Sequence, residues 1–185
     1  MNPIQDLMKE HEAVELTLKI LDKICSSIEQ SGKISNPEHL NQLIEFFMVF
    51  VDKCHHGKEE ELLFPSLEAV GIQRDHGPIG VMLAEHQQGR EYVQKMNTAI
   101  SQYKDGDPEA AAELVKNARA YIALLRQHID KENNVLFPLG DNRLSEEKKA
   151  ELWEGFEIIE TQKIGTGKHE EFHKMLEYFE GVYLK

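Results

Sequence analysis

The length, composition and charge of the chain limit what it can be. It has 185 residues, of which 41% are hydrophobic and 29% are charged, as in a soluble globular protein with one buried core. The formal net charge of -12 disfavours nucleic-acid and membrane partners, because an acidic surface repels phosphate and anionic lipid. The N-terminus lacks the basic-then-apolar pattern of a signal peptide, and the longest apolar run, residues 46–51, is too short to span a bilayer. We therefore expect one cytoplasmic domain over residues 1–185.

Apolar residues recur every three or four positions in four segments, as in helices that bury one face. We expect these helices at residues 4–31, 37–64, 78–103 and 108–137. Asn36 and Asp107 precede prolines in the way that N-caps do, and glycine or proline follows each helix. Short turns inside the first and second pairs of helices make each pair antiparallel. No stretch shows sustained strand alternation, so the predicted fold class is all-α.

The helical core contains an internal repeat and is followed by an extension. Residues 55–65 (HHGKEEELLFP) recur as residues 128–138 (HIDKENNVLFP), with six of eleven positions identical. This recurrence predicts two matched helical hairpins related by a pseudo-two-fold axis, each carrying half of a site. Residues 139–185 follow, where Ser145 begins one expected helix and residues 165–167 separate it from another. We expect this C-terminal extension to pack against or across the core.

Six ionisable residues lie on the apolar faces of the predicted helices. Burying one such group without a partner costs several kcal/mol. Six would unfold a domain whose stability is roughly 5–15 kcal/mol, so they must satisfy one another or hold a ligand. Each histidine of the set is 19 to 22 residues from its hairpin turn, which is about 30 Å along a helix, so antiparallel pairing brings all four to one level. The set is His11, His55, Glu59, His86, His128 and Glu132.

The chemistry of these side chains indicates a two-metal site. Imidazole and carboxylate without thiolate suit iron, manganese or zinc. Glu59 and Glu132 each follow a histidine by one helical turn and are placed to bridge two ions. Six protein ligands cannot fill two octahedral ions, so positions would remain for water, hydroxide, dioxygen, peroxide or nitric oxide. Cys25 and Cys54 are expected to be free core residues, because they would lie too far apart along the bundle for a disulfide.

The order of the ligands resembles the hemerythrin-like family over about residues 4–138. A lone histidine, an HxxxE pair, a second lone histidine and a second HxxxE pair fall one to each helix. The resemblance implies an up-down antiparallel four-helix bundle with a di-iron centre, in which the histidines are terminal ligands and Glu59 and Glu132 are bridges. Met82 stands where oxygen-carrying members have a further histidine, which counts against reversible oxygen carriage. Six-ligand members include proteins linked to repair of iron centres and to nitric-oxide or peroxide handling.

The functional hypothesis is a di-iron protein that binds or reacts with dioxygen, peroxide or nitric oxide in redox sensing or stress defence. Its redox partner is unknown. The alternative is an iron sensor, buffer or donor without catalysis, because no substrate pocket is recognisable in the sequence. Two further classes are less favoured. The HExxH pattern of residues 169–173 matches zinc hydrolases but lacks a third ligand, and a ferritin-like oxidase needs ExxH pairs on its core helices.

Several residues near the six have expected roles of their own. His56 and Glu60 neighbour ligands but are expected to point around the helix, as outer or surface groups. Glu60, Glu160 or His169 remains a candidate for an additional ligand. The pocket for a small ligand is expected to be shaped by Met82 and Gly89, where the glycine, one turn from His86, leaves room.

Overall fold

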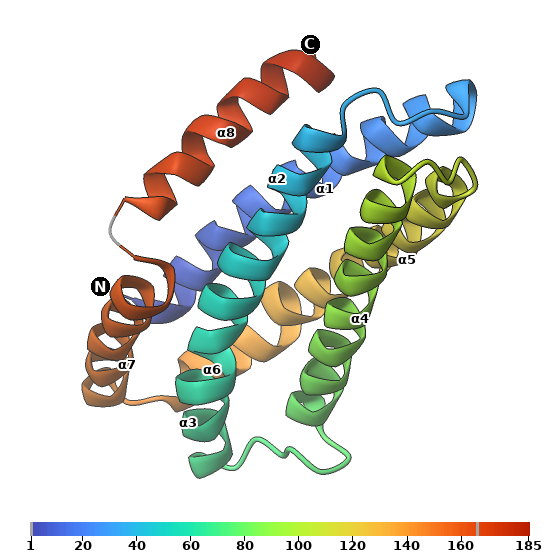
Figure 1. Ribbon diagram of the computed structural model, residues 1–185. Coiled ribbons are helices and arrows are strands. Elements are labelled where there is room, and N and C mark those ends of the chain that lie inside the picture. The colour runs from blue at the N-terminus through green and yellow to red at the C-terminus, as the bar shows by residue number, and fades with distance from the viewer. Residues whose placement is uncertain (1, 166) are drawn as a thin grey trace.

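The computed structural model describes residues 2–165 and 167–185, and every regular element in that part of the chain is a helix (Figure 1). The all-α prediction is therefore confirmed. Thr166, within the expected separator at residues 165–167, lies outside the described residues. None of the described helices is long and apolar enough to cross a membrane. The division of the chain into a single domain stays a prediction.

Four long helical segments form the core of the fold. The first is α1 (Pro3–Ser31). The second runs without a break from α2 (Pro37–Phe46) through two wide-turn π-helical stretches, η1 (Phe47–His56) and η2 (Glu59–Leu63), into α3 (Phe64–Ala69). The third is α4 (Pro78–Lys104). The fourth joins α5 (Ala110–Lys131), the π-helical η3 (Glu132–Leu136) and α6 (Phe137–Arg143).

The helices begin where capping residues satisfy their first amides. The side chain of Asn2 accepts a hydrogen bond from the backbone N–H of Ile4 at 2.9 Å, ahead of Pro3. Asn36 does the same for the N–H of His39 at 3.3 Å. The first helix ends at Gly32, whose φ of 68° is a left-handed conformation that glycine adopts without strain. Three of the four predicted helix starts and the end of the first helix therefore agree with the structure, whereas α5 begins two residues later than expected.

The expected ends of the second and fourth helices, near Phe64-Pro65 and Phe137-Pro138, are wrong. Both segments continue past the proline, to Ala69 and Arg143. Proline lacks an N–H and crowds the carbonyl four residues before it. The turn before each proline is widened instead, so that the N–H groups of Phe64 and Phe137 donate to the carbonyl oxygens of Glu59 and Glu132, five residues back. The two halves of the internal repeat share this irregularity.

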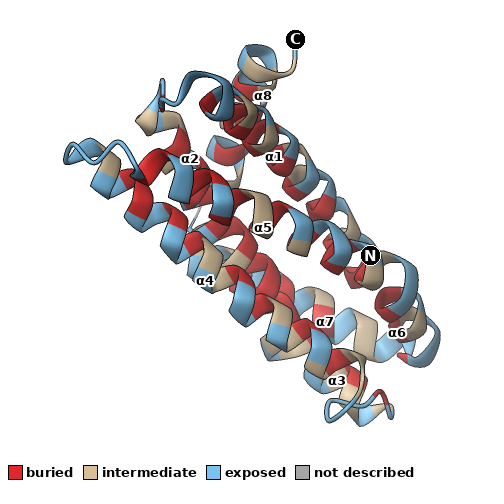
Figure 2. Ribbon diagram, turned by 90° about the vertical axis from the view of Figure 1, so that its right-hand side faces the viewer, coloured by how far each residue is buried: buried red, intermediate tan, exposed pale blue. Residues whose placement is uncertain are grey.

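The long segments pack side by side with their buried faces inward (Figure 2). α5 lies along both α1 and α4, and α4 also contacts α2 and η1. The extension consists of α7 (Glu146–Ile159), η4 (Glu160–Ile164) and α8 (Lys168–Tyr183). α7 packs against η2 and α1, η4 packs against η1, and α8 packs along α1 (Figure 1). The extension therefore covers the first two core segments, as expected.

The buried apolar residues form two clusters, one toward each end of the long segments. On α1, Leu7 belongs to one cluster and Val14 to the other, and His11 lies between them. On α4, Met82 and Val93 flank His86 in the same way. The core is thus interrupted by one polar layer.

Candidate metal centre

The six sequence-predicted site residues meet in the polar layer. All are buried, at 2% exposure or less. Nε2 of His11 and Nε2 of His128 lie 3.2 and 3.3 Å from Oε2 of Glu132. Nε2 of His55 and Nε2 of His86 lie 3.5 and 3.4 Å from the two carboxylate oxygens of Glu59. The structure therefore brings together one histidine from each long segment and the two glutamates.

Most of the atoms that face the centre are left without partners, whereas Nε2 of His86 and Nε2 of His128 lie 3.1 Å from each other. Among the described residues, no hydrogen bond reaches Nε2 of His11, Nε2 of His55 or any carboxylate oxygen of Glu59 and Glu132. Orphaned polar atoms in a protein interior are costly and call for a missing partner. Imidazole nitrogens and carboxylate oxygens turned toward one point suit a cation, so the donor set fits a metal site.

The outer nitrogen of each of the four histidines is fixed by an oxygen acceptor. Nδ1 of His55 donates to Glu10 at 2.7 Å, and Nδ1 of His86 donates to Glu60 at 2.7 Å. Nδ1 of His128 donates to Glu85 at 2.9 Å, and that of His11 donates to the side-chain oxygen of Asn133 at 2.8 Å. Such bonds fix the tautomer and leave Nε2 free to bind a metal.

Each of the three outer carboxylates is held in turn by a cation. Lys58 donates to Glu10 at 2.6 Å, Arg90 donates to Glu60 at 2.6 Å, and Lys131 donates to Glu85. Lys58 and Lys131 occupy equivalent positions of the internal repeat. Sequence reasoning missed Glu10 and Glu85. The sequence signal that could have found them is the repeated HxxK spacing, because the lysines of both repeats bind the carboxylates that hold the histidines.

Burial and neighbouring charge set the protonation of the central groups. Burial and the adjacent carboxylate of Glu132 raise the pKa of Glu59 well above its usual value. Burial alone would also raise the pKa of Glu132, but His128 and His11 outweigh it and lower that pKa. Burial and the nearby His11 lower the pKa of His55 well below its usual value. A neutral imidazole is the form that binds a metal, and a bound cation would replace the proton of the carboxylate pair.

The other candidate ligands are placed differently from one another. Glu60 binds His86 and Arg90, so it is an outer group, as expected. His169 lies against His173 and Phe50, outside the groups of buried ligand atoms. Glu160 accepts from Lys58 at 3.3 Å, and its ligand atom is grouped with those of Glu10 and Cys54 rather than with those of the polar layer. His56 was expected to be an outer or surface group, but it is 4% exposed and one of its nitrogens joins Glu59, His86 and His128 within 4.8 Å. The wide turns of η1 turn this side chain further inward than an α-helix would.

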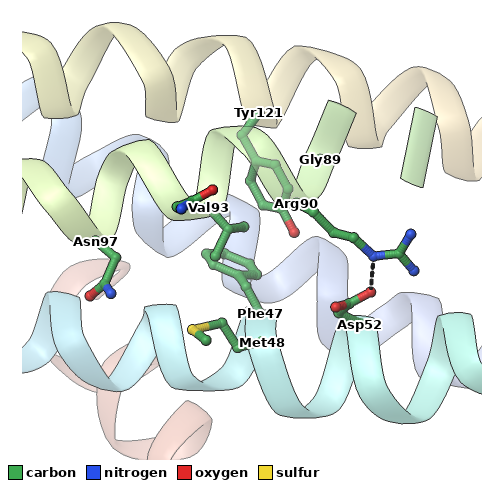
Figure 3. A pocket seen from close by; sticks show the side chains of 9 residues that line it. Phe47, Met48, Asp52, Gly89, Arg90, Val93, Asn97 and Tyr121 are labelled. Carbon is green, nitrogen blue, oxygen red and sulfur yellow. Dashed lines mark hydrogen bonds and ion pairs between the residues drawn. The ribbon is translucent and has the colours of Figure 1, made fainter. Parts of the chain in front are cut away.

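A cavity of about 430 Å³ lies between η1, α4 and α5 next to this layer (Figure 3). Its wall is mainly apolar, with the ion pair of Arg90 and Asp52 at one end, where Nε of Arg90 donates at 2.7 Å. Gly89, one of the two residues expected at a small-ligand pocket, lines this cavity. Met82 instead packs in the apolar cluster on the other side of the polar layer.

The two cysteines, Cys25 and Cys54, are free and buried, as the sequence predicted.

A family model for the hemerythrin HHE cation binding domain matches residues 2–140 of the chain. The chain belongs to the hemerythrin HHE family. The match includes all six residues of the polar layer and stops before α7. The family binds cations, and the buried histidine–glutamate cluster is the part of this hemerythrin domain that is suited to hold one.

Two groups of relatives bear on the function of this hemerythrin domain. An uncharacterized protein of Mycobacterium tuberculosis is 27% identical over 161 residues, which cover 87% of this chain and 62% of the relative, and a Mycobacterium bovis protein matches equally. The chain thus spans less than two thirds of these relatives. The iron-sulfur cluster repair protein YtfE of Salmonella newport is 36% identical over 156 residues, covering 72% of this chain and 70% of YtfE. No solved structure matches the chain.

Proposed function

We propose that this hemerythrin domain holds two iron ions and uses them to bind or react with nitric oxide, dioxygen or peroxide in a stress response. One observation carries the proposal: the buried ligand atoms fall into two sets that share Glu59. The first set is His11, His55, Glu59 and Glu132, and the second is His56, Glu59, His86 and His128. Glu59 directs one oxygen to His55 and the other to His86, so its carboxylate spans both sets.

The assignment takes the four long segments as an up-down bundle with one metal-binding element from each. His11, His55, His86 and His128 would be terminal ligands, and Glu59 and Glu132 would be the bridges. When bound, iron supplies a Lewis-acid and redox centre. The chain supplies the orientation of the imidazoles through Glu10, Glu60, Glu85 and Asn133, and a dry core on both sides of the layer.

The small ligand is proposed from two observations. Six protein ligands leave open positions on two metal ions, and the neighbouring, mainly apolar cavity of about 430 Å³ has room for a small, weakly polar molecule (Figure 3). The similarity to YtfE, which is named as an iron-sulfur cluster repair protein, supports a role in conditions that damage iron centres. A cytoplasmic location and the lack of nucleic-acid and membrane partners stay predictions from charge and composition.

Iron content and an optical spectrum test this function. The wild-type chain is expected to bind two irons, with absorption bands that change when azide, nitric oxide or oxygen is added. Glu59→Ala removes the carboxylate shared by both sets, so it should lower the iron content. Glu91→Ala, which changes an exposed glutamate of α4, is the control and should bind iron like the wild type. Unchanged iron content in Glu59→Ala would defeat the assignment.

One observation favours iron donation as a second candidate function. A surface cavity of about 520 Å³ is lined by acidic residues and histidines, and one of them, Glu10, is also the residue that holds His55. A ferrous ion could use such a wall of oxygen and nitrogen atoms on its way to or from the centre. Iron donation predicts that iron passes readily to a chelator and that Glu160→Ala slows this transfer. It also predicts no spectral response to nitric oxide. These results together would favour donation over a reaction with a small ligand.

A further inference from the structure

A fifth histidine lies in the polar layer besides the four that the internal repeat predicts. The ring of His56 stacks on that of His86, with 3.7 Å between ring centroids and 14° between planes. It is 4% exposed, and its Nδ1 makes no hydrogen bond among the described residues. One of its nitrogens lies within 4.8 Å of the ligand atoms of Glu59, His86 and His128. A buried, unpartnered imidazole beside three candidate ligands needs an explanation.

The surroundings of His56 resemble those of the other histidines in part. Its Nδ1 lies 3.6 Å from Oδ1 of Asp52, which is longer than the hydrogen bonds that fix Nδ1 in the other four. Asp52 is held by Arg90 at 2.7 Å, and the same guanidinium donates at 2.6 Å to Glu60, the partner of His86. One arginine thus fixes the outer carboxylates of both stacked imidazoles. No hydrogen bond therefore occupies Nδ1 of His56, and one nitrogen of this ring lies among the candidate ligand atoms.

His56 also breaks the symmetry of the internal repeat. The repeat aligns His55 with His128 and Glu59 with Glu132, but it aligns His56 with Ile129. Ile129 is buried in an apolar cluster, so the second half of the repeat offers no comparable donor. The two halves of the site are therefore unequal by one imidazole.

We propose that His56 is a seventh protein ligand, bound through one of its ring nitrogens to the ion that His86 and His128 would hold. This inference rests on the proposed two-iron function. The ion of His86 and His128 would then have three imidazoles besides the shared carboxylates, and the ion of His11 and His55 would have two. The ion of His11 and His55 would keep more open positions, so the small exogenous ligand is expected to bind to that ion.

The test compares His56→Phe with the wild type by iron content, Mössbauer spectra and azide titration. Phenylalanine keeps a flat ring over His86 but has no donor nitrogen. We expect the wild type to show two unequal iron signals and one azide site. The variant should show more similar signals, a second azide site, and one iron that is lost to a chelator on the order of 10–100-fold more readily. His76→Phe, the same change at an exposed histidine of the connection before α4, should leave all three readouts unchanged.

A second variant separates ligation from packing. His56→Ala leaves a ring-sized space that added imidazole can fill, so imidazole should restore the wild-type iron signals. Pyrrole has the same ring size but no donor lone pair on nitrogen, so it should not restore them. If His56→Phe does not fold, this pair of rescue measurements decides the question alone.

Three outcomes would count against the proposal. If His56→Phe keeps the wild-type iron signals and iron retention, or if pyrrole rescues His56→Ala as well as imidazole does, His56 is a packing residue and the two-iron function stands. If the wild type itself binds fewer than two irons, the proposed function fails and the seventh ligand fails with it.

Discussion

Lys58 donates a hydrogen bond to Glu10 across 2.6 Å, and both side chains are buried. The ammonium also lies 3.5 Å from Asp6 and 3.3 Å from Glu160. The equivalent lysine of the internal repeat, Lys131, binds Glu85, but its side chain is 37% exposed. Two residues at equivalent positions thus sit in different electrostatic surroundings.

This difference predicts unequal effects on stability. Lys58→Met leaves Glu10 as a buried charge without its cation and should cost about 3–5 kcal/mol of the free energy of unfolding. Lys131→Met removes a half-exposed ion pair and should cost about 1 kcal/mol or less. Urea denaturation of the metal-free proteins measures both. Equal losses would show that the burial of Lys58 does not matter to the fold.

Acid should destabilise the metal-free chain through two histidines. Burial, assisted by His11 for His55 and by His86 for His56, lowers the pKa of both well below the usual value of 6.5. At mildly acid pH the unfolded chain therefore binds protons on these two histidines, whereas the folded chain does not. Their contribution to the free energy of unfolding is present above about pH 6.5 and is lost as the pH falls toward the pKa values of the folded chain. A tenfold difference in proton affinity is about 1.4 kcal/mol, or about 3–6 °C in Tm.

Thermal melting from about pH 7 to about pH 5 measures this loss. Two groups oppose the trend in part, because Glu132 raises the pKa of His11 against the effect of burial, and burial together with Glu132 raises the pKa of Glu59. His56→Phe should show a weaker fall of Tm with acid than the wild type does. A Tm that rises on acidification would contradict the assignment of neutral, buried imidazoles.

Removing the metal should lower the stability of the whole domain. A ligand at 100 times its dissociation constant stabilises the folded state by about 2.7 kcal/mol. The chelator-treated protein is therefore expected to melt several degrees below the iron-loaded protein, and added ferrous iron should restore the Tm. Glu59→Ala serves as the comparison, because its Tm should respond much less to iron.

The cavity beside Gly89 predicts a size limit at that position. A Cβ there would lie 3.5 Å from the ring of Tyr121, an ordinary contact. Gly89→Ala should fold well and gain up to about 1 kcal/mol from helix propensity. Gly89→Leu extends into the cavity, so stopped-flow measurements should show slower azide binding. Gly181→Leu on α8, where nothing lies within 4 Å, is the control for side-chain size alone.

The two thiols should be unreactive in the folded protein. Burial raises the pKa of both Cys25 and Cys54 to about 12. Because the thiolate is the reactive form, a thiol reagent should label neither cysteine quickly in the native protein and both in denaturant. Fast native labelling of Cys54, which lies near Glu10 and Glu160, would show that this region opens.

The amino-acid sequence by itself determined the helices and the meeting of six candidate ligands in one layer. The spacing of apolar residues located the helical faces, and the equal distance of each histidine from its turn put all four at one level. Both features follow from the rise and period of an α-helix, which are local properties. The repeated HxxxE pattern added the shared carboxylates, because residues four apart lie on one face.

Only the tertiary structure decided where His56 points and what holds the outer nitrogens. The prolines at 65 and 138 were expected to end helices, but the chain widens its turns instead and continues. A separate π-helical stretch, η1, rotates its own side chains away from an α-helical pattern, so periodicity could not place His56. Glu10 and Glu85 reach their histidines from neighbouring helices, and such contacts depend on how helices pack rather than on any spacing along the chain.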